Sequence, residues 1–257
     1  MRLRRFGCPI RGAPAERARR ACLCFYDRVL PPEGPSFENR LQTVENRIQH
    51  ALQSSGRKRP DITLVAVTKK FSAVRIREGY AAGLRHFGEN YVQEFAGKLP
   101  ELQDLKDARF HLIGHLQSNK ARLASQIFQT IQTVDSGKLL ERLDAAAGEL
   151  DRDIDVLFEI KLSEEQSKTG ADPNLLPELM DTAVKRVHVS GLMTVPPWSE
   201  DAEQSRPYFR RLAALAKQYG LRELSMGMSG DFEVAIEEGA TIIRVGTALF
   251  GPRPKPT

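Results

Sequence analysis

The chain has 257 residues, and none of its apolar runs approaches the roughly 20 residues that a membrane-spanning helix needs. Its net charge of +5 comes from residues 1–35, which hold eight Arg and three acidic residues, so residues 36–257, with 30 basic and 30 acidic residues, are neutral. We therefore expect one soluble domain without a membrane span and without the basic face that nucleic-acid binding requires.

Residues 1–35 differ in composition from the rest of the chain. They are rich in Arg, contain all three cysteines, and have no uninterrupted apolar stretch of the kind found in a secretory signal. We expect a basic, disordered N-terminal extension before a domain at 36–257, with an Arg-rich transit peptide as the less favoured alternative. Because the domain has no cysteine and its histidines are scattered, we expect no disulfide or metal site, and a cytoplasmic location.

Strand-like and helical segments alternate along residues 36–257, which is typical of parallel βαβ units. The first helix begins at Phe37, after Ser36 as a possible cap, and ends before Gly56. Further helices are predicted at 74–82, 136–149, 173–185, 203–219 and 232–238. Strands are predicted at 62–69, 85–88, 110–114, 130–135, 154–161, 187–194, 223–228 and 241–246. Eight strands favour a closed (β/α)8 barrel, a TIM barrel, over an open sheet.

The first predicted strand ends in two lysines, Lys69 and Lys70. In a barrel of this class, functional residues gather at the C-terminal ends of the strands, and a lysine there can form a Schiff base with a phosphorylated aldehyde. Side-chain alternation places Lys69 on the face of Val65 and Lys70 on that of Ala66. From the residues alone, both lysines remain candidates.

The loops after the last two predicted strands resemble the two halves of a phosphate site. Ser229 and Gly230 follow one strand, and Gly246 and Thr247 follow the next. Backbone N–H groups at such positions favour an anion, although ordinary helix caps and turns would use the same residue types. Because they occur in consecutive loops at the end of the barrel, we favour the phosphate interpretation.

Three further residues are candidates. Arg244 lies inside an apolar strand, where its charge requires an anion, an acceptor or a structural salt bridge. Asn90 follows the second strand, where it could contact a ligand or cap a helix. Met193 could contact a ligand ring or simply fill the barrel interior.

Several longer segments resemble the pyridoxal phosphate homeostasis proteins, the single-domain relatives of the alanine racemase N-terminal barrel. The resemblance runs in one order over roughly residues 37–252. It departs from the family's usual Lys-Thr-Lys-Pro, which here reads Lys69-Lys70-Phe71-Ser72. The segments that carry it are Leu64–Lys69, Phe87–Glu94, His111–Lys120, Ser167–Gly170, Gly191–Met193, Leu224–Asp231 and Arg244–Gly251.

The resemblance implies a cofactor, pyridoxal 5′-phosphate, held as an internal aldimine. It assigns the aldimine to Lys69 and so separates this residue from Lys70. It also implies that Arg244 faces the pyridine nitrogen, which an adjacent positive charge would keep unprotonated. By the same resemblance, Asn90 and Met193 lie near the ring, and the phosphate is held by Ser229, Gly230, Gly246 and Thr247.

The resemblance also implies a role in cofactor homeostasis. A two-base racemase needs an acid or base on each face of its substrate, and in the two-domain relatives the second base comes from a domain that we do not expect here. We therefore expect a protein that binds, stores and releases pyridoxal phosphate, with apo forms of cofactor-dependent enzymes as transient recipients, rather than an enzyme. The alternatives are a pyridoxal-phosphate-dependent amino-acid racemase and a Schiff-base aldolase acting on a sugar phosphate.

Overall fold

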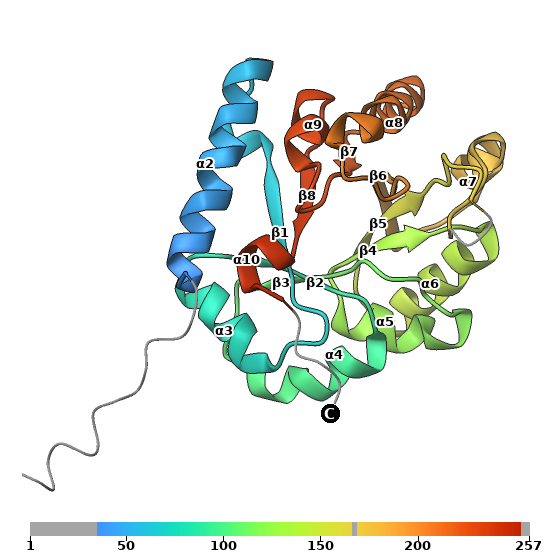
Figure 1. The fold of residues 1–257 in the computed structure, drawn as a ribbon. Coiled ribbons are helices and arrows are strands. Elements are labelled where there is room, and N and C mark those ends of the chain that lie inside the picture. The colour runs from blue at the N-terminus through green and yellow to red at the C-terminus, as the bar shows by residue number, and fades with distance from the viewer. Residues whose placement is uncertain (1–34, 166–168, 253–257) are drawn as a thin grey trace, which may run out of the picture. The chain divides into compact units, whose positions relative to one another are not determined.

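The structure, a computed structural model, describes residues 35–165 and 169–252. From Phe37 onward these residues form a compact unit around a closed barrel of eight parallel strands in chain order, in which the last strand pairs with the first (Figure 1). The predicted (β/α)8 barrel is confirmed. The expected extension at 1–35, apart from Pro35, and the Ser167–Lys168 part of one motif lie outside the described residues.

Every predicted strand is present. The strands are β1 (Thr63–Val67), β2 (His86–Glu89), β3 (Arg109–Leu112), β4 (Thr130–Val134), β5 (Ile154–Glu159), β6 (Val187–Met193), β7 (Glu223–Ser225) and β8 (Ile242–Val245). β7 is shorter than the predicted 223–228, because the chain leaves the strand at Met226 and turns into the loop that leads to the next helix.

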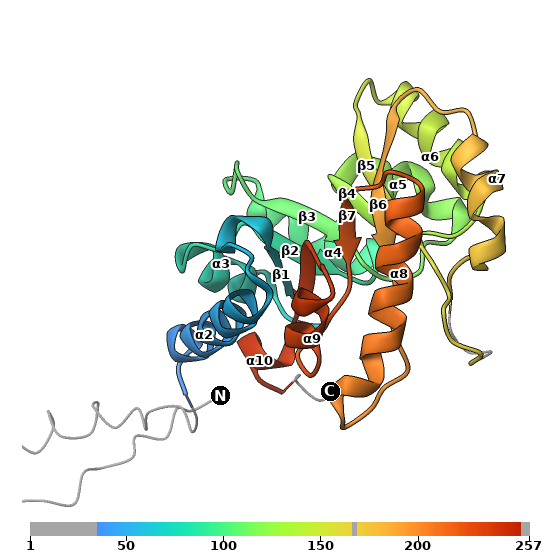
Figure 2. The ribbon, with the colours of Figure 1, turned by 90° about the horizontal axis from the view of Figure 1, so that it is seen from above.

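The helices surround the barrel (Figures 1 and 2). They are α2 (Phe37–Ser55), α3 (Ala73–Ala81), α4 (Val92–Lys98), α5 (Ala121–Ile127), α6 (Gly137–Glu149), α7 (Leu176–Asp181), α8 (Arg206–Gln218), α9 (Phe232–Glu237) and α10 (Thr247–Phe250). Short 3-10 helices occur at Arg59–Asp61, Leu99–Leu102, Ser118–Lys120, Pro173–Leu175 and Ala202–Ser205. In the described part of the chain, no helix is long and apolar enough to cross a membrane.

One predicted helix is longer in the sequence pattern than in the structure. The pattern predicts a helix over 173–185, whereas α7 ends at Asp181. The Asp144 carboxylate accepts hydrogen bonds from the backbone N–H groups of Lys185, Arg186 and Val187, at 2.7, 2.6 and 3.1 Å. These bonds hold residues 185–187 in a non-helical conformation at the entry to β6, so the predicted helix does not extend to residue 185.

The helix α2 covers the part of the barrel wall where the chain closes on itself. Its buried residues include Phe37, Val44, Ile48 and Leu52, as the predicted spacing requires. This apolar face packs against α9 and α10, the helices that follow β7 and β8 (Figure 2). The Arg40 Nε atom also donates a hydrogen bond to the Leu249 carbonyl at 2.7 Å. The first helix of the domain thus supports its last two loops.

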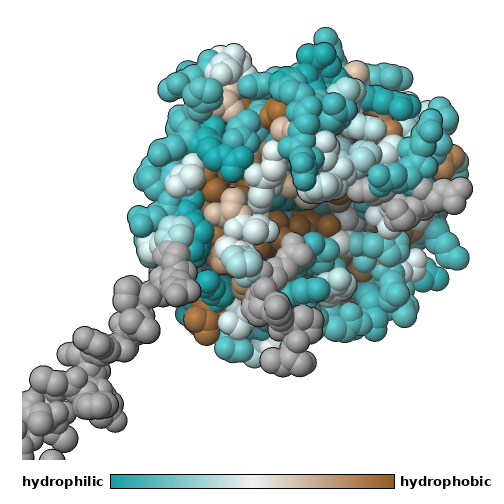
Figure 3. Space-filling model, viewed as in Figure 1, coloured by the Kyte–Doolittle hydropathy of each residue, from teal (hydrophilic) through white to brown (hydrophobic). Residues whose placement is uncertain are grey.

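The strands present two different faces to the core. The main cluster joins one face of the strands to the helices. Hydrophilic side chains cover most of the surface that Figure 3 shows, and apolar side chains are visible toward its middle. A smaller apolar cluster on the other face contains Val65, Leu157, Met193 and Ile242. Because alternate residues of a barrel strand point inward, this smaller cluster fills part of the barrel interior.

Candidate functional site

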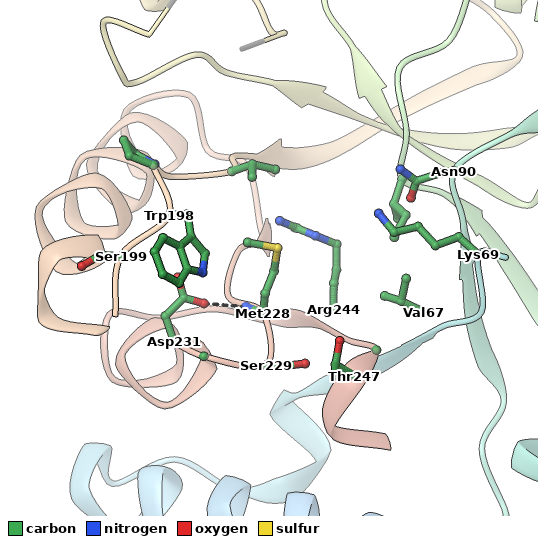
Figure 4. Close-up of a pocket in the computed structure, with 15 residues that line it drawn as sticks. Val67, Lys69, Asn90, Trp198, Ser199, Met228, Ser229, Asp231, Arg244 and Thr247 are labelled. Atoms are coloured by element: carbon green, nitrogen blue, oxygen red, sulfur yellow. Dashed lines mark hydrogen bonds between the residues drawn. The ribbon is translucent and has the colours of Figure 1, made fainter. Parts of the chain in front are cut away.

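A cavity of about 520 Å³ opens at the C-terminal ends of the strands (Figure 4). Loops that follow β1, β2, β6, β7 and β8 supply most of its lining. It is lined by Val67, Lys69, Asn90, Ile113, Val195, Pro197, Trp198, Ser199, Met228, Ser229, Gly230, Asp231, Arg244, Gly246 and Thr247. Its position is that of functional sites in barrels of this class.

This cavity brings together all the predicted cofactor residues except Met193. Met193 is 1% exposed and packs in the barrel interior, in the cluster with Val65, Leu157 and Ile242. The structure also adds residues that the sequence pattern does not single out. Trp198, 81% exposed, lies at the rim beside Ser199. These come from the loop after β6, where only the Pro-Pro sequence marks the end of the strand.

The two lysines after β1 have different positions. Lys69 is half-buried and lines the cavity, and its side chain extends toward Asn90 (Figure 4). Lys70 is exposed, with a positive φ of 65°, and its backbone N–H donates to the Glu94 Oε1 atom at 2.6 Å. The chain therefore turns sharply after Lys69, so that only the first lysine lines the cavity. A left-handed conformation of this kind leaves no trace in the periodicity of the sequence.

A buried ionic cluster fixes the chain next to Lys69. The Lys98 Nζ atom contacts the Thr68 carbonyl at 3.1 Å, Glu89 Oε1 at 2.9 Å and Glu94 Oε1 at 2.7 Å. The Thr68 hydroxyl also donates to Glu89 Oε1 at 2.7 Å. Burial raises the pKa of the Glu89 carboxyl, and the charge of Lys98 opposes this effect. The cluster sets the exit direction of β1 and so positions Lys69.

The loops after β7 and β8 meet at another wall of the cavity. The hydroxyl groups of Ser229 and Thr247 lie on this side in Figure 4. The Ala248 backbone N–H donates to Ser229 Oγ at 3.4 Å, which links the two loops. A Cβ atom at Gly246 would lie 3.3 Å from the Val67 Cβ, so glycine allows the loop to approach β1 closely. Backbone N–H groups and two hydroxyls at one wall suit an anionic group.

Side chains outside the cavity hold the loop after β7. The Arg47 Nη2 atom donates to the Ser229 carbonyl at 3.1 Å, and the guanidinium pairs with both carboxylate oxygens of Glu233, at 2.5 and 2.8 Å. The Asp231 carboxylate accepts from the Met228 backbone N–H at 2.7 Å, shown in Figure 4, and from the Ser205 hydroxyl at 2.8 Å. The loop is therefore ordered by contacts within the chain.

Arg244 is a buried cation with neutral partners. It is 4% exposed, its Nη1 atom donates to Ser225 Oγ at 2.6 Å, and its Nη2 atom donates to the Thr194 carbonyl at 2.9 Å. In the described part of the chain no carboxylate lies within salt-bridge distance of it, so the structural salt bridge considered above is absent there. Burial lowers the pKa of Arg244 to about 10, while the more distant negative charges of Asp231 and Glu159 act to raise it. The group stays charged at neutral pH and faces the cavity.

A second cavity of about 200 Å³ adjoins the first and shares Asn90, Ile113 and Val195 with it. It contains His115 and the buried Glu159, whose Oε1 accepts from the Thr169 hydroxyl at 2.8 Å. Burial raises the pKa of the Glu159 carboxyl. Across residues 35–165 and 169–252 there is no group of three or more His, Cys, Asp or Glu that could hold a metal ion.

Comparison with known proteins identifies relatives over nearly the whole barrel. The sequence profile of the alanine racemase N-terminal domain matches residues 40–254. A pyridoxal phosphate homeostasis protein of Aquifex aeolicus is 43% identical over 222 residues, which cover 83% of this chain and 97% of that protein. A protein of the same name from Pseudomonas aeruginosa is 44% identical over 218 residues, covering 83% of this chain and 94% of that protein.

Solved structures give the same result. PipY of Synechococcus elongatus, solved with pyridoxal phosphate bound, is 42% identical and superimposes with a TM-score of 0.73, over 84% of this chain and 100% of its own. Alanine racemase of Clostridium difficile shares the fold, with a TM-score of 0.61 at 13% identity over 84% of this chain and 57% of its own. The chain therefore belongs to the alanine racemase N-terminal domain family and, within it, to the pyridoxal phosphate homeostasis proteins.

Proposed function

We propose that this protein binds pyridoxal 5′-phosphate in the 520 Å³ cavity and acts in homeostasis of that cofactor by binding, storing and releasing it. The observation that carries the proposal is that one cavity contains a lysine, two loops suited to a phosphate, and the buried charge of Arg244. The volume is within the range of small-molecule sites, roughly 300–1,000 Å³. The PipY structure, which holds the same cofactor, supports the assignment.

The residues present fit the chemistry of this cofactor. When bound, pyridoxal phosphate supplies an aldehyde that reacts with amines and a pyridine ring that can take up electron density. The Lys69 amine would bind the aldehyde carbon, and the backbone and hydroxyl groups of Ser229, Gly230, Gly246 and Thr247 would hold the phosphate. Arg244 has five N–H hydrogens, of which two donate to Ser225 and Thr194, so others remain for an acceptor in the cavity.

We propose further that the protein handles the cofactor rather than using it for rapid turnover. A charged guanidinium beside the pyridine nitrogen disfavours its protonation and so weakens the ring as an electron sink. Asp231 is the only acidic side chain among the described residues that line the cavity. Its carboxylate already accepts hydrogen bonds from the Met228 backbone N–H and the Ser205 hydroxyl. A two-base reaction would need a second proton-transfer group besides Lys69.

The proposal includes the domain boundaries and the recipients. Residues 36–257 would form the cofactor-binding domain, which agrees with a family match that begins at residue 40, and residues 1–35 would precede it as an extension. Released cofactor would pass to apo enzymes in the cytoplasm, the compartment that the cysteine distribution predicts.

One experiment separates a carrier from an enzyme. The purified protein loaded with pyridoxal phosphate is given a panel of amino acids and, separately, an apo-transaminase. We expect negligible racemisation, transamination and decarboxylation, together with recovery of transaminase activity. Turnover near the enzyme median of about 10 s⁻¹ on any amino acid would favour the racemase alternative. If transaminase activity recovers no faster than with free cofactor at the same concentration, the protein would store the cofactor but would not deliver it to enzymes.

A further inference from the structure

A row of polar side chains crosses the barrel interior beneath Arg244. Ser225 on β7, Gln132 on β4 and His111 on β3 are buried, and His86, the first residue of β2, is half-buried. Polar groups are costly in such an interior unless they are hydrogen-bonded. Their presence beside the apolar interior cluster therefore calls for a reason beyond filling space.

Hydrogen bonds connect these side chains from Arg244 at the cavity to His86 near the opposite end of the barrel. The Ser225 Oγ atom, which accepts from Arg244, lies 2.6 Å from Gln132 Oε1. The Gln132 Nε2 atom lies 3.1 Å from His111 Nδ1, and His111 Nε2 lies 2.9 Å from His86 Nδ1. Each member contacts the next, so the series is continuous.

The direction of each bond in the series follows from Arg244 together with the orientation of the Gln132 amide. A guanidinium only donates, so Ser225 Oγ accepts from it, and the Ser225 hydroxyl donates to the Gln132 Oε1 atom, which can only accept. The amide then presents its NH₂ group to His111, whose Nδ1 must accept. His111 therefore carries its proton on Nε2 and donates to His86 Nδ1, which leaves the His86 proton on Nε2.

This arrangement needs neutral histidines, and their surroundings provide that condition. Burial, followed by the neighbouring His86 and the charge of Arg109, lowers the pKa of His111 to about 3. Burial, and then Arg109, also lowers the pKa of His86. Arg109 is itself 3.6 Å from the Asp155 carboxylate. At neutral pH both rings are uncharged, so His111 can accept from Gln132.

We propose that Ser225, Gln132 and His111 are positioning residues that orient the Arg244 guanidinium toward the cavity, and that each histidine of the series is held in the Nε2–H tautomer. The orientation of Arg244 toward the cofactor ring rests on the proposed function, whereas the tautomers do not. A role in packing alone would require neither a single bond direction nor a defined tautomer.

The tautomers are measured on the cofactor-free protein by ¹⁵N NMR of labelled histidine, at pH 7.5, with His86→Gln and His111→Gln to assign the signals. We expect both rings to be neutral and protonated on Nε2. A neutral His111 protonated on Nδ1, or a charged ring, would overturn the proposal. This measurement needs no cofactor, so it is separate from any failure of the proposed function.

The link to Arg244 is tested with Gln132→Glu and Ser225→Ala. In Gln132→Glu a carboxylate oxygen replaces the NH₂ group, so the His111 proton should move to Nδ1 while the series stays connected. In Ser225→Ala the guanidinium loses an acceptor, and we expect a shifted absorption maximum of the loaded protein and about tenfold weaker cofactor binding.

Ser125→Ala is the matched control, because Ser125 is also fully buried and its hydroxyl has no hydrogen-bond partner. We expect it to leave the spectrum, the binding and the tautomers unchanged. If the Ser225→Ala spectrum and affinity equal those of the control, Ser225 does not position Arg244 and the proposal fails. If Ser225→Ala does not fold, an unchanged His111 tautomer in Gln132→Glu contradicts the directional series in the same way.

Discussion

A buried guanidinium whose hydrogen-bond acceptors are all neutral has no ion-pair partner in contact, and Arg244 is such a group among the residues that the structure describes. Burying the charge without such a partner costs folding free energy unless a ligand supplies a further acceptor. Residues that are costly to the fold are typical of functional sites, where the interaction with the ligand offsets the cost. The surroundings of Arg244 therefore point to an acceptor brought in by a ligand.

The neighbouring histidine gives a prediction for stability against pH. Unfolded His111 titrates near 6.5, whereas in the folded protein its pKa is about 3. As pH falls from 6.5 toward 3, the unfolded state takes up a proton that the folded state does not, so the free energy of unfolding should decrease, by at most about 1.4 kcal/mol per pH unit from this group. His111→Gln should reduce the slope, measured by urea unfolding between pH 7 and 4.

The exposed His50 offers a matched control, because its ring lies on the surface of α2. His50→Gln should leave the slope of unfolding free energy against pH close to that of the wild type. If His111→Gln also leaves the slope unchanged, His111 does not have the depressed pKa that its burial implies.

At the level of elements, the two final loops should act together on the phosphate. Replacing Ser229 and Thr247 by Ala removes two hydroxyls at one wall of the cavity. Hydrogen bonds to a charged group contribute about 1.5–3 kcal/mol each, so the double variant should bind the cofactor two to four powers of ten more weakly if the effects add. Equilibrium dialysis of the folded variant measures this. An unchanged affinity for the cofactor would indicate that both residues serve only as helix caps or turn residues.

The helix α2 should influence the same loop from outside the cavity. Arg47→Met removes both the hydrogen bond to the Ser229 carbonyl and the pair with Glu233. We expect α2 to remain folded, because its apolar face is untouched, and cofactor affinity to fall severalfold as the loop loses a support. Isothermal titration of wild type and variant with pyridoxal phosphate measures the difference.

The control for this variant is Arg59→Met. Arg59 pairs with Glu45 on α2 with similar side-chain exposure, 33% and 29% against 35% and 31% for Arg47 and Glu233, and it does not contact the loop. Equal affinities for the two variants would show that the general loss of an ion pair, rather than support of Ser229, explains any effect.

For the whole molecule, the sequence predicts the barrel well because strand-like and helical segments alternate along it, and the eight strands pair in chain order. It does not predict α5 or α10, which have seven and four residues, too few for helical periodicity to show. The lining residues Trp198 and Ser199 are also missed, because their positions depend on how loops fold over the strands. Spacing along the chain does not contain that information.

The sequence also predicts part of the candidate site. Strand ends brought Lys69, Asn90 and Arg244 to one cavity, as parallel strands require. The choice between Lys69 and Lys70 depends in the structure on a positive φ at Lys70, and alternation alone could not resolve it. The hydrogen-bonded series that begins at Arg244 joins residues from five strands, so its members become neighbours only when the barrel closes.

The most direct test of the account is to locate the cofactor on the chain. The yellow, loaded protein is reduced with borohydride, which makes the bond between cofactor and amine permanent, and the peptides are mapped by mass spectrometry. We predict a pyridoxyl group on Lys69, loss of labelling in Lys69→Ala, and full labelling in the control Lys70→Ala. Labelling mainly on Lys70, or a yellow protein with no labelled peptide, would contradict the assignment of the site.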